Sequence, residues 1–306
     1  MDELAQQLSP FYEQAGFAPL PPRTRLETTG ADAKRFLHNY CTADILRLTP
    51  GQGAELFITS VKGKVLSHGF VFVGEESLIY ETVAGEAEKL IGHLDRYTLA
   101  DDVELKDVSD GWAFLYVGGP AAAGLLQEAT GEPVPQDHLA FKEAKLGEIP
   151  LTYSRGGAIS PHGFTFWCRE DHLTALRAEL ANAGVAEASS DVVEVLRVEA
   201  GLPLYGRDVT EDHLPQEVNR NRQAISLTKG CYLGQETVAR LDALGHVNKL
   251  LVGVQLAGDV VPVAGAELLA GGTPAGIVTS AVYSPTLKSP LALAYVKTKQ
   301  GELPLS

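Results

Sequence analysis

A cysteine that follows a lysine by two positions is the feature of this sequence with the plainest chemical capability. The stretch Lys229–Glu236 reads KGCYLGQE, and Arg240 follows it closely. If these residues are extended, the side chains of Lys229 and Cys231 point to the same side. A neighbouring ammonium group favours the thiolate form of a cysteine, which is its nucleophilic form. We therefore predict a functional Cys231 assisted by Lys229 and Arg240; the alternative is a small buried residue.

A glutamate on the apolar side of a predicted helix is the second such feature. The helix starts at Ser189-Ser190 and stops before Gly201, because serine favours the first position of a helix and glycine the position after its end. At about 100° per residue, Glu199 lies in the middle of the apolar arc, whereas Arg197 and Glu194 lie on the far side. No neighbour on the same helix can therefore form an ion pair with the Glu199 carboxylate.

The inward position of Glu199 requires some partner for its carboxylate. An unpaired carboxylate in a low-dielectric site costs several kcal/mol, so the group is either protonated or met by donors. Backbone amides, a distant arginine or water could supply those donors. A ligand could also supply them, because a flat ring with adjacent N–H groups, such as pterin or guanine, binds both carboxylate oxygens. The residues alone leave both possibilities open.

The region before residue 110 must position these groups, and its pattern is that of an antiparallel α+β unit. Apolar spacing of three and four predicts a helix over 30–40. Extended patterns on both sides of Lys62-Gly63-Lys64 predict a hairpin over 54–73, with Gly63 in its turn. A strand over 78–83, a helix over 86–97 and a strand near 103–108 follow. This order favours antiparallel pairing over repeated β-α-β units.

The remainder of the chain shows a mixed strand and helix pattern, followed by a pattern of short strands alone. A strand over 113–117 leads through Gly118-Gly119-Pro120 into an alanine-rich helix, and this turn lacks the pattern of a phosphate-binding loop. A helix over 170–180 precedes the helix that carries Glu199. After Gly245 the sequence consists of short β runs separated by glycine and proline, at 250–256, 275–282 and 291–296. These runs predict a small all-β terminal domain.

Composition and charge exclude several classes of function. The 306 residues correspond to about two domains, and a net charge of −14 argues against binding nucleic acid through a basic face. The cysteines Cys41, Cys168 and Cys231 form no C-x-x-C pair, so neither a disulfide framework nor a metal site is predicted. No apolar run reaches the ~18 residues of a membrane span. We expect a cytoplasmic protein without membrane attachment.

Two sets of residues carry a resemblance to known families. The KGCYLGQE stretch and Leu214-Pro215-Gln216-Glu217 resemble the signature of the YgfZ family. Arg197–Gly206, which reads RVEAGLPLYG, and Gly30–Leu37 resemble the glycine cleavage T-protein, an aminomethyltransferase. The resemblance implies an α+β fold of three lobes around a central channel. Two α+β lobes with antiparallel sheets would occupy 1–240, the second inserted in the first at about 52–110, and a C-terminal β-barrel lobe 245–306.

The resemblance also implies a cofactor and partners. In the T-protein the glutamate that matches Glu199 holds the pterin of tetrahydrofolate, so we expect tetrahydrofolate or a one-carbon derivative here. Arg197, Gln235 and Arg240 are expected to help Glu199 bind it. YgfZ relatives carry the cysteine that matches Cys231 and are linked to iron–sulfur cluster assembly or repair and, through cluster enzymes, to tRNA modification. We therefore expect iron–sulfur client or assembly proteins as partners, with no direct nucleic-acid contact.

One departure from the T-protein bears on activity. The T-protein uses a hairpin acid at the position of Ser67 or His68, but Thr59–Gly69 contains no Asp or Glu, so ordinary aminomethyl transfer is not expected. Three functions remain. The first is a tetrahydrofolate-binding factor that supports iron–sulfur enzymes, with Cys231 as an exposed redox or transient ligand group. The second is a folate-dependent aminomethyl or one-carbon transferase in which His68 or another group replaces the acid. The third is a non-catalytic interaction scaffold.

Overall fold

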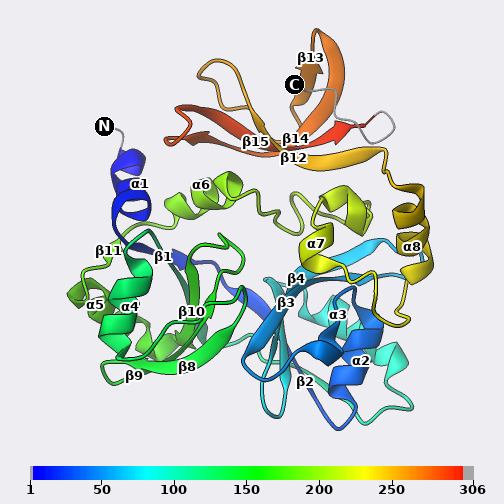
Figure 1. The fold of residues 1–306 in the computed structure, drawn as a ribbon, viewed down its shortest axis with the longest axis horizontal. Helices are drawn as coiled ribbons and strands as arrows, with labels where there is room; N and C mark the ends of the chain where they lie inside the picture. The colour runs from blue at the N-terminus through cyan, green and yellow to red at the C-terminus, as the bar shows by residue number, and fades with distance from the viewer. Residues whose placement is uncertain (1–2, 299–306) are drawn as a thin grey trace.

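Three β-sheets with helices packed on and between them make up the architecture of the chain (Figure 1). The computed structural model describes residues 3–298. The named strands pair antiparallel, except for β1 (Gly16–Leu20), which pairs parallel with β11 (Ala186–Glu187). This arrangement confirms the expected α+β class with antiparallel sheets. Within residues 3–298, no helix is both long and apolar enough to cross a membrane.

A six-stranded sheet with the order β11-β1-β7-β10-β9-β8 forms the first lobe. Its further strands are β7 (Trp112–Gly118), β8 (Phe141–Leu146), β9 (Ile149–Arg155) and β10 (Phe164–Arg169). Helices α4 (Ala122–Thr130) and α5 (Leu173–Asn182) pack on it through buried side chains such as Leu126 and Leu176. The strand expected over 113–117 and the helix expected over 170–180 are confirmed, the latter beginning with a 3-10 turn at Glu170–His172.

A five-stranded sheet with the order β3-β4-β5-β2-β6 forms the second lobe. The elements of this lobe are β2 (Arg23–Thr29), β3 (Gln52–Thr59), β4 (Val65–Val73), β5 (Leu78–Val83), β6 (Glu104–Asp107), α2 (Ala33–Tyr40), α3 (Ala87–Leu94) and the 3-10 turns Ile45–Arg47 and Asp95–Tyr97. The hairpin expected over 54–73 is confirmed, and Gly63 adopts a φ of +74° in its turn. The lobe begins before the expected boundary near 52, because β2 pairs with both β5 and β6.

Helices α1 and α6 lie between the first lobe and the C-terminal sheet. The elements that connect the lobes are α1 (Glu3–Glu13), α6 (Asp191–Glu199), the 3-10 turn Pro215–Val218, α7 (Asn221–Ala224) and α8 (Gln235–Leu244). The sequence pattern does not predict α1, because proline is unfavourable inside a helix and α1 contains Pro10. Helix α1 packs against α6, and α6 packs against the C-terminal sheet.

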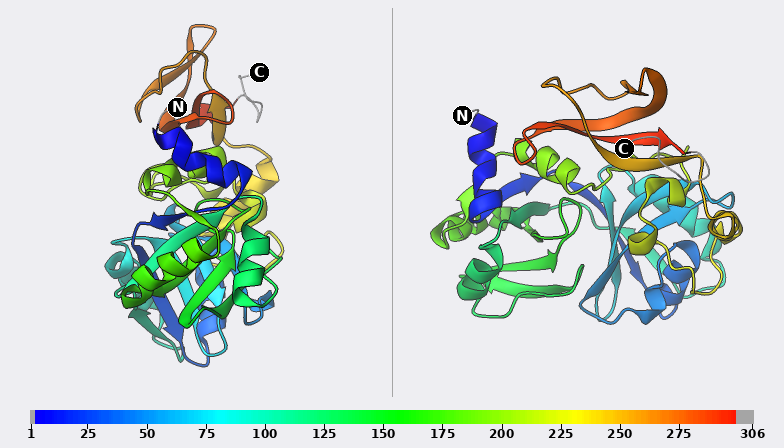
Figure 2. Two further views of the ribbon diagram at one scale, coloured as in Figure 1. Left: turned by 90° about the vertical axis from the view of Figure 1, so that its left-hand side faces the viewer. Right: turned by 45° about the horizontal axis from the view of Figure 1, so that its top comes forward.

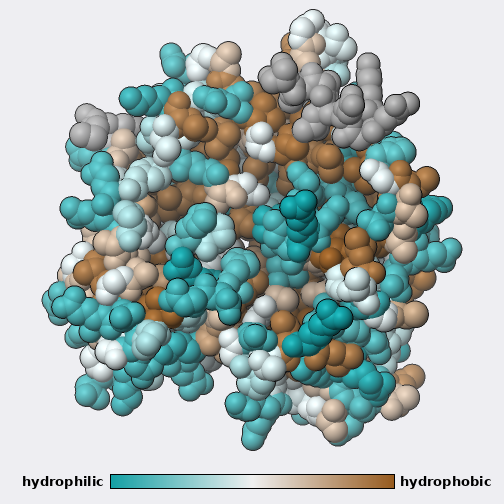
Figure 3. All heavy atoms as spheres, in the orientation of Figure 1, coloured by the Kyte–Doolittle hydropathy of each residue, from teal (hydrophilic) through white to brown (hydrophobic). Residues whose placement is uncertain are grey.

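The C-terminal sheet covers α6 from above (Figure 2). It has the order β12-β15-β14-β13, formed by β12 (Lys249–Gln255), β13 (Glu267–Ala270), β14 (Thr273–Ser284) and β15 (Ser289–Lys297). The β runs expected after Gly245 are therefore confirmed. Among the described residues, β12 and β13 do not pair, so the sheet is open rather than a closed barrel. Hydrophobic residues gather near it on the face shown in Figure 3.

Candidate functional site

Glu199 is the last residue of α6, and two hydroxyl groups from distant parts of the chain meet its carboxylate. Tyr12 on α1 donates to Oε2 at 2.8 Å, and Ser284 at the end of β14 donates to Oε1. Burial and the Glu199 carboxylate raise the pKa of the Tyr12 phenol, so this group remains a donor. Val195 and Leu196 on the same side of α6 are buried, at 3% and 8% exposure. The expected apolar setting of Glu199 is therefore confirmed, and donors meet its charge.

A cavity of about 580 Å³ adjoins the Glu199 carboxylate. Its wall includes three aromatic and two nitrogen-bearing side chains, namely Phe11, Tyr116, Phe164, Arg155 and His162. A carboxylate offers about four acceptor positions, and the two hydroxyl groups use two of them. The volume lies within the roughly 300–1,000 Å³ of small-molecule sites. A flat ring that carries two adjacent N–H donors therefore fits beside Glu199.

Arg197 lies on the same helix but is fully committed to other contacts. The residue is 2% exposed. Its Nη1 donates to the carbonyl oxygen of Leu202 and to Asp208, its Nε and Nη2 donate to Glu194, and Nη2 also donates to Ser280. All five N–H donors of the guanidinium group are thereby used. The expectation that Arg197 helps to bind a cofactor is wrong, because the C-terminal sheet covers its side of α6 and leaves it no free donor.

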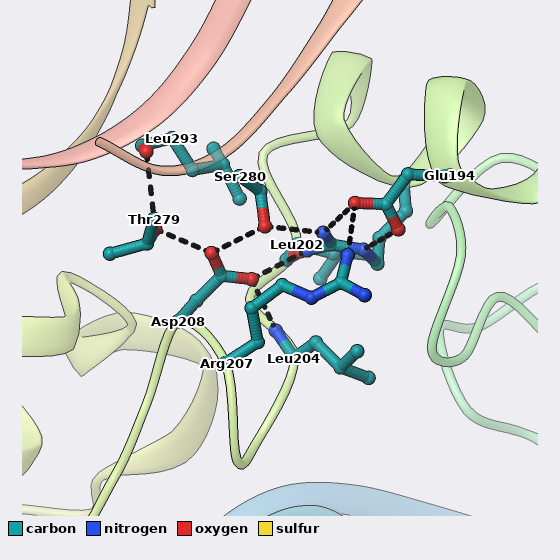
Figure 4. A network of polar contacts seen from close by, with 9 residues as sticks. Glu194, Leu202, Leu204, Arg207, Asp208, Thr279, Ser280 and Leu293 are labelled. Carbon is teal, nitrogen blue, oxygen red and sulfur yellow. Dashed lines mark hydrogen bonds and ion pairs between the residues drawn. The ribbon is translucent and has the colours of Figure 1, made fainter. Parts of the chain in front are cut away.

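Asp208 is the centre of the network that Arg197 joins (Figure 4). Its carboxylate is fully buried and accepts four hydrogen bonds, from Arg197 at 2.8 Å, the backbone N–H of Leu204 at 2.9 Å, Ser280 at 2.7 Å and Thr279 at 2.5 Å. Because Thr279 and Ser280 belong to β14, the network fastens the C-terminal sheet to α6. Strand β14 also carries the serine that holds Glu199, so the network positions the site indirectly.

Lys229 supports the second lobe and does not face Cys231. Its side chain is buried, and Nζ donates to the backbone carbonyl groups of His38, Cys41 and Ala43 at the end of α2. The thiol beside it is that of Cys41, whose pKa burial raises to about 11 in spite of the Lys229 ammonium. The expectation that Lys229 assists Cys231 is therefore wrong. Alternation along an extended segment does not apply, because residues 227–229 form a bend.

Cys231 is exposed, whereas Cys41 and Cys168 are buried. The loop that carries it is fixed at the next residues, since Thr59 donates to the carbonyl of Leu233 at 2.6 Å. The N–H of Leu233 in turn donates to the carbonyl of Asn39 at 2.9 Å. The thiol therefore stands on a loop that is held firmly against the second lobe. The interpretation of Cys231 as a small buried residue is wrong.

Two further predicted binding residues lie on α8, away from Glu199. Gln235 is the first residue of α8 and is partly exposed, and Arg240 is exposed on the same helix. Neither of them lines the cavity beside Glu199. The structure thus separates Glu199 from Cys231 and from the two predicted residues on α8. Within residues 3–298, no cluster of three or more His, Cys, Asp and Glu side chains could hold a metal ion.

A buried acid that the sequence reasoning missed lies on the first strand of the β3–β4 hairpin. Glu55 on β3 is 1% exposed; it binds Nε2 of His68 at 2.8 Å and receives two hydrogen bonds from Arg220. Burial raises the pKa of Glu55, but the bonds from Arg220 and His68 outweigh it and lower the pKa to about 2. Phe57 stacks on the His68 ring at 4.9 Å. A charged residue within the apolar run of β3 is the signal that could have revealed this group.

Comparisons with known proteins match most of the chain. The GCVT N-terminal domain model matches residues 5–229, and the glycine cleavage T-protein C-terminal barrel domain model matches residues 249–303. An aminomethyltransferase of Rubrobacter xylanophilus is 31% identical over 268 residues, which is 87% of this chain and 72% of the relative. An aminomethyltransferase of Caldanaerobacter subterraneus is 30% identical over 281 residues, 90% of this chain and 75% of the relative.

A solved structure shows the same fold. The glycine cleavage system aminomethyltransferase T of Bartonella henselae superposes with a TM-score of 0.82 at 21% sequence identity. The match covers 96% of this chain and 81% of the other. The three-lobed arrangement expected from the resemblance therefore agrees with a known architecture.

Proposed function

The chain belongs to the family defined by the GCVT N-terminal domain and the glycine cleavage T-protein C-terminal barrel domain, and from this premise we propose that it binds a tetrahydrofolate beside Glu199. One observation carries the proposal. A half-buried carboxylate, with about two free acceptor positions, stands at the edge of a cavity of about 580 Å³. The resemblance of the RVEAGLPLYG stretch to the T-protein supports the same role for Glu199.

The chemistry of a pterin ring matches this carboxylate. The ring presents an amino group beside a ring N–H, and two parallel hydrogen bonds to one carboxylate fix both position and orientation. The hydroxyl groups of Tyr12 and Ser284 hold the carboxylate in place for that contact. Phe11 and Tyr116, whose rings stack at 6.0 Å, add a flat apolar wall. When bound, tetrahydrofolate carries one-carbon units, and these side chains bind and orient its ring.

We further propose that the protein supports iron–sulfur enzymes through Cys231. The thiol is exposed on a fixed loop, so a partner protein can reach it. A single thiol supplies one of the four ligands that a cluster typically uses. A cluster in contact with Cys231 would therefore be shared with a client or assembly protein. The YgfZ-like KGCYLGQE stretch supports this function, and the link to tRNA modification follows through such client enzymes.

A folate-dependent one-carbon transferase is the second candidate, and the Glu55–His68 pair favours it. Residues 59–69 of the hairpin lack the acid of the T-protein, but Glu55 on its first strand, β3, bonds to His68 on its second strand, β4. An ionised carboxylate bonded to an imidazole holds that ring in one orientation for proton transfer. The Arg220 guanidinium would hold Glu55 ionised throughout. A third candidate is a non-catalytic scaffold, which predicts no folate binding at all.

Titration calorimetry with tetrahydrofolate tests the binding proposal. Glu199→Gln is expected to weaken binding by about 1.5–3 kcal/mol, the worth of charged hydrogen bonds, which corresponds to roughly 10- to 150-fold. Glu13→Gln on exposed α1 surface is the matched control and is expected to bind as the wild type does. Equal affinity of wild type and a folded Glu199→Gln protein refutes the assignment. Absence of binding at millimolar folate supports the scaffold.

Complementation separates the cluster role from the transferase role. Cys231→Ala is expected to retain fold and folate affinity but to fail to restore iron–sulfur enzyme activity in a strain that lacks the gene. Cys168→Ala removes a buried thiol and is the control. Full rescue by Cys231→Ala refutes the role of the thiol. Turnover with tetrahydrofolate and an aminomethyl-loaded carrier protein, lost in His68→Ala, supports the transferase instead.

A further inference from the structure

A second cavity, of about 610 Å³, lies where the two lobes face each other. Residues of β2, β4 and β6 line one side, and residues of β7, β8 and β10 line the other. It shares no lining residue with the cavity beside Glu199. Its size lies within the roughly 300–1,000 Å³ range of small-molecule sites. The fold thus contains a second, partly open cavity of ligand size that the proposed folate site does not use.

Four aromatic side chains form part of the wall of this second cavity. They are Phe72, Trp112, Phe141 and Trp167. The ring of Phe72 lies 5.1 Å from that of Trp167 and 5.4 Å from that of Phe141. Phe72 and Trp167 are buried and Trp112 and Phe141 are partly exposed. Because Arg25 and Arg169 lie over the Trp112 ring, Phe141 offers the π face on which a planar ring can stack. Flat heteroaromatic ligands are therefore the class that this surface suits.

A buried guanidinium group with unmet donors lines the same cavity. Arg25 is 4% exposed, and its guanidinium lies over the Trp112 ring at 4.3 Å. Its Nε and Nη1 make no hydrogen bond. Nε is 3.1 Å from Glu81, but Glu81 also faces Arg23 at 3.7 Å. One carboxylate is therefore shared by two guanidinium groups, and an additional oxygen acceptor is favoured beside Arg25.

Carboxylates on the rim of the cavity favour hydrogen-bond donors on the ligand, whereas Arg25 favours an acceptor. Four acidic side chains also line the cavity, namely Glu27, Asp107, Asp110 and Glu143. Among the described residues, none of these four makes an ion pair or hydrogen bond with Arg25. A neutral ring that offers an oxygen to Arg25 and N–H groups to the rim satisfies both. Guanine and pterin share such a ring, a fused pyrimidine whose edge carries an oxo group, a ring N–H and an amino group in that order.

We propose that this cavity is a second ligand site, which binds a guanine-type or pterin-type ring stacked on the aromatic wall with its oxo group at Arg25. A neighbouring cavity of about 600 Å³ shares five lining residues with it, namely Trp112, Glu143, Thr152, Trp167 and Arg169. That continuation leaves room for a sugar or another substituent on the ring. The proposal is independent of folate binding at Glu199, because the two sites share no residue.

Intrinsic fluorescence reports on this site directly, because both tryptophans of the chain line it. Guanosine and hydroxymethylpterin are the probes, and they distinguish a nucleoside from a pterin source of the ring. Adenosine is the control, since it places an amino group where the oxo group should be. We expect at least one probe to quench the tryptophans with saturation, and adenosine to leave them unchanged.

Variants test the two polar contacts separately. Arg25→Lys keeps the charge but loses the planar fork and is expected to weaken probe binding at least tenfold. Glu143→Gln changes an exposed residue, so the protein remains folded, and should weaken binding as well. Glu199→Gln should leave probe binding unchanged, even when it abolishes folate binding. Equal quenching by adenosine, no quenching by either probe, or unaltered binding in folded Arg25→Lys and Glu143→Gln proteins overturns the proposal.

Discussion

Replacement of Asp208 by asparagine tests whether the buried network fastens the C-terminal sheet to the body. The substitution keeps the size of the side chain but removes its charge. The new NH₂ group must point toward the hydroxyl groups of Thr279 and Ser280, because the other oxygen faces the N–H donors of Arg197 and Leu204. Removing one partner of a buried ion pair costs about 3–5 kcal/mol.

The contacts of Arg197 indicate where in this range the loss of unfolding free energy should lie. Glu194, whose side chain is 36% exposed, still pairs with Arg197 after the substitution. Since this pair retains part of the charge compensation, we expect the lower end, a loss of about 3 kcal/mol of unfolding free energy. That is a large part of the ~5–15 kcal/mol of a typical protein. Folate affinity should also fall, because β14 carries Ser284 to Glu199.

Urea denaturation, followed by circular dichroism, measures the effect of Asp208→Asn. Thr279→Val is the matched control, since it removes one neutral hydroxyl group from the same network and should cost only about 1 kcal/mol. A folded Asp208→Asn protein whose loss is no greater than that of Thr279→Val would refute the reasoning. In that case the packing of apolar side chains, rather than the ion pair, fastens the sheet.

Three further predictions concern the other buried groups. Because the folded pKa of Glu55 is lowered to about 2 from 4.5, its contribution to the unfolding free energy is complete well above pH 4.5 and disappears as the pH falls toward 2. The unfolding free energy of Glu55→Gln, measured against pH, should therefore lack this loss at acid pH. The same loss in wild type and Glu55→Gln contradicts the prediction. Cys231 should react rapidly with a thiol reagent in the native state while Cys41 reacts only after unfolding, as mass spectrometry of labelled peptides will show. Lys229→Met should destabilise the fold by about 1–3 kcal/mol, because it removes the donor that the carbonyl groups of His38, Cys41 and Ala43 share. It should not slow the labelling of Cys231; slower labelling would show that Lys229 does assist the thiol.

Local pattern predicts much of the fold. The helical period places Glu199 on the apolar side of α6, and alternating apolar residues on both sides of Gly63 identify the β3–β4 hairpin. These predictions succeed because side-chain period is a property of a few neighbouring residues. The C-terminal strands are recognised for the same reason. Helix α1 is not predicted from the sequence, because Pro10 interrupts the local pattern, although packing against α6 stabilises the helix.

The partners of the charged groups depend on the tertiary structure alone. Glu199 meets Tyr12, which is 187 positions away, and Glu55 meets Arg220, which is 165 positions away. The local pattern also places Arg197 on an outer surface that a later sheet covers. By itself, the sequence determines which side chains turn inward, because that follows from backbone period. Which groups they meet there is decided only when distant segments pack together, since a buried charge takes whatever partner the completed fold brings within hydrogen-bond distance.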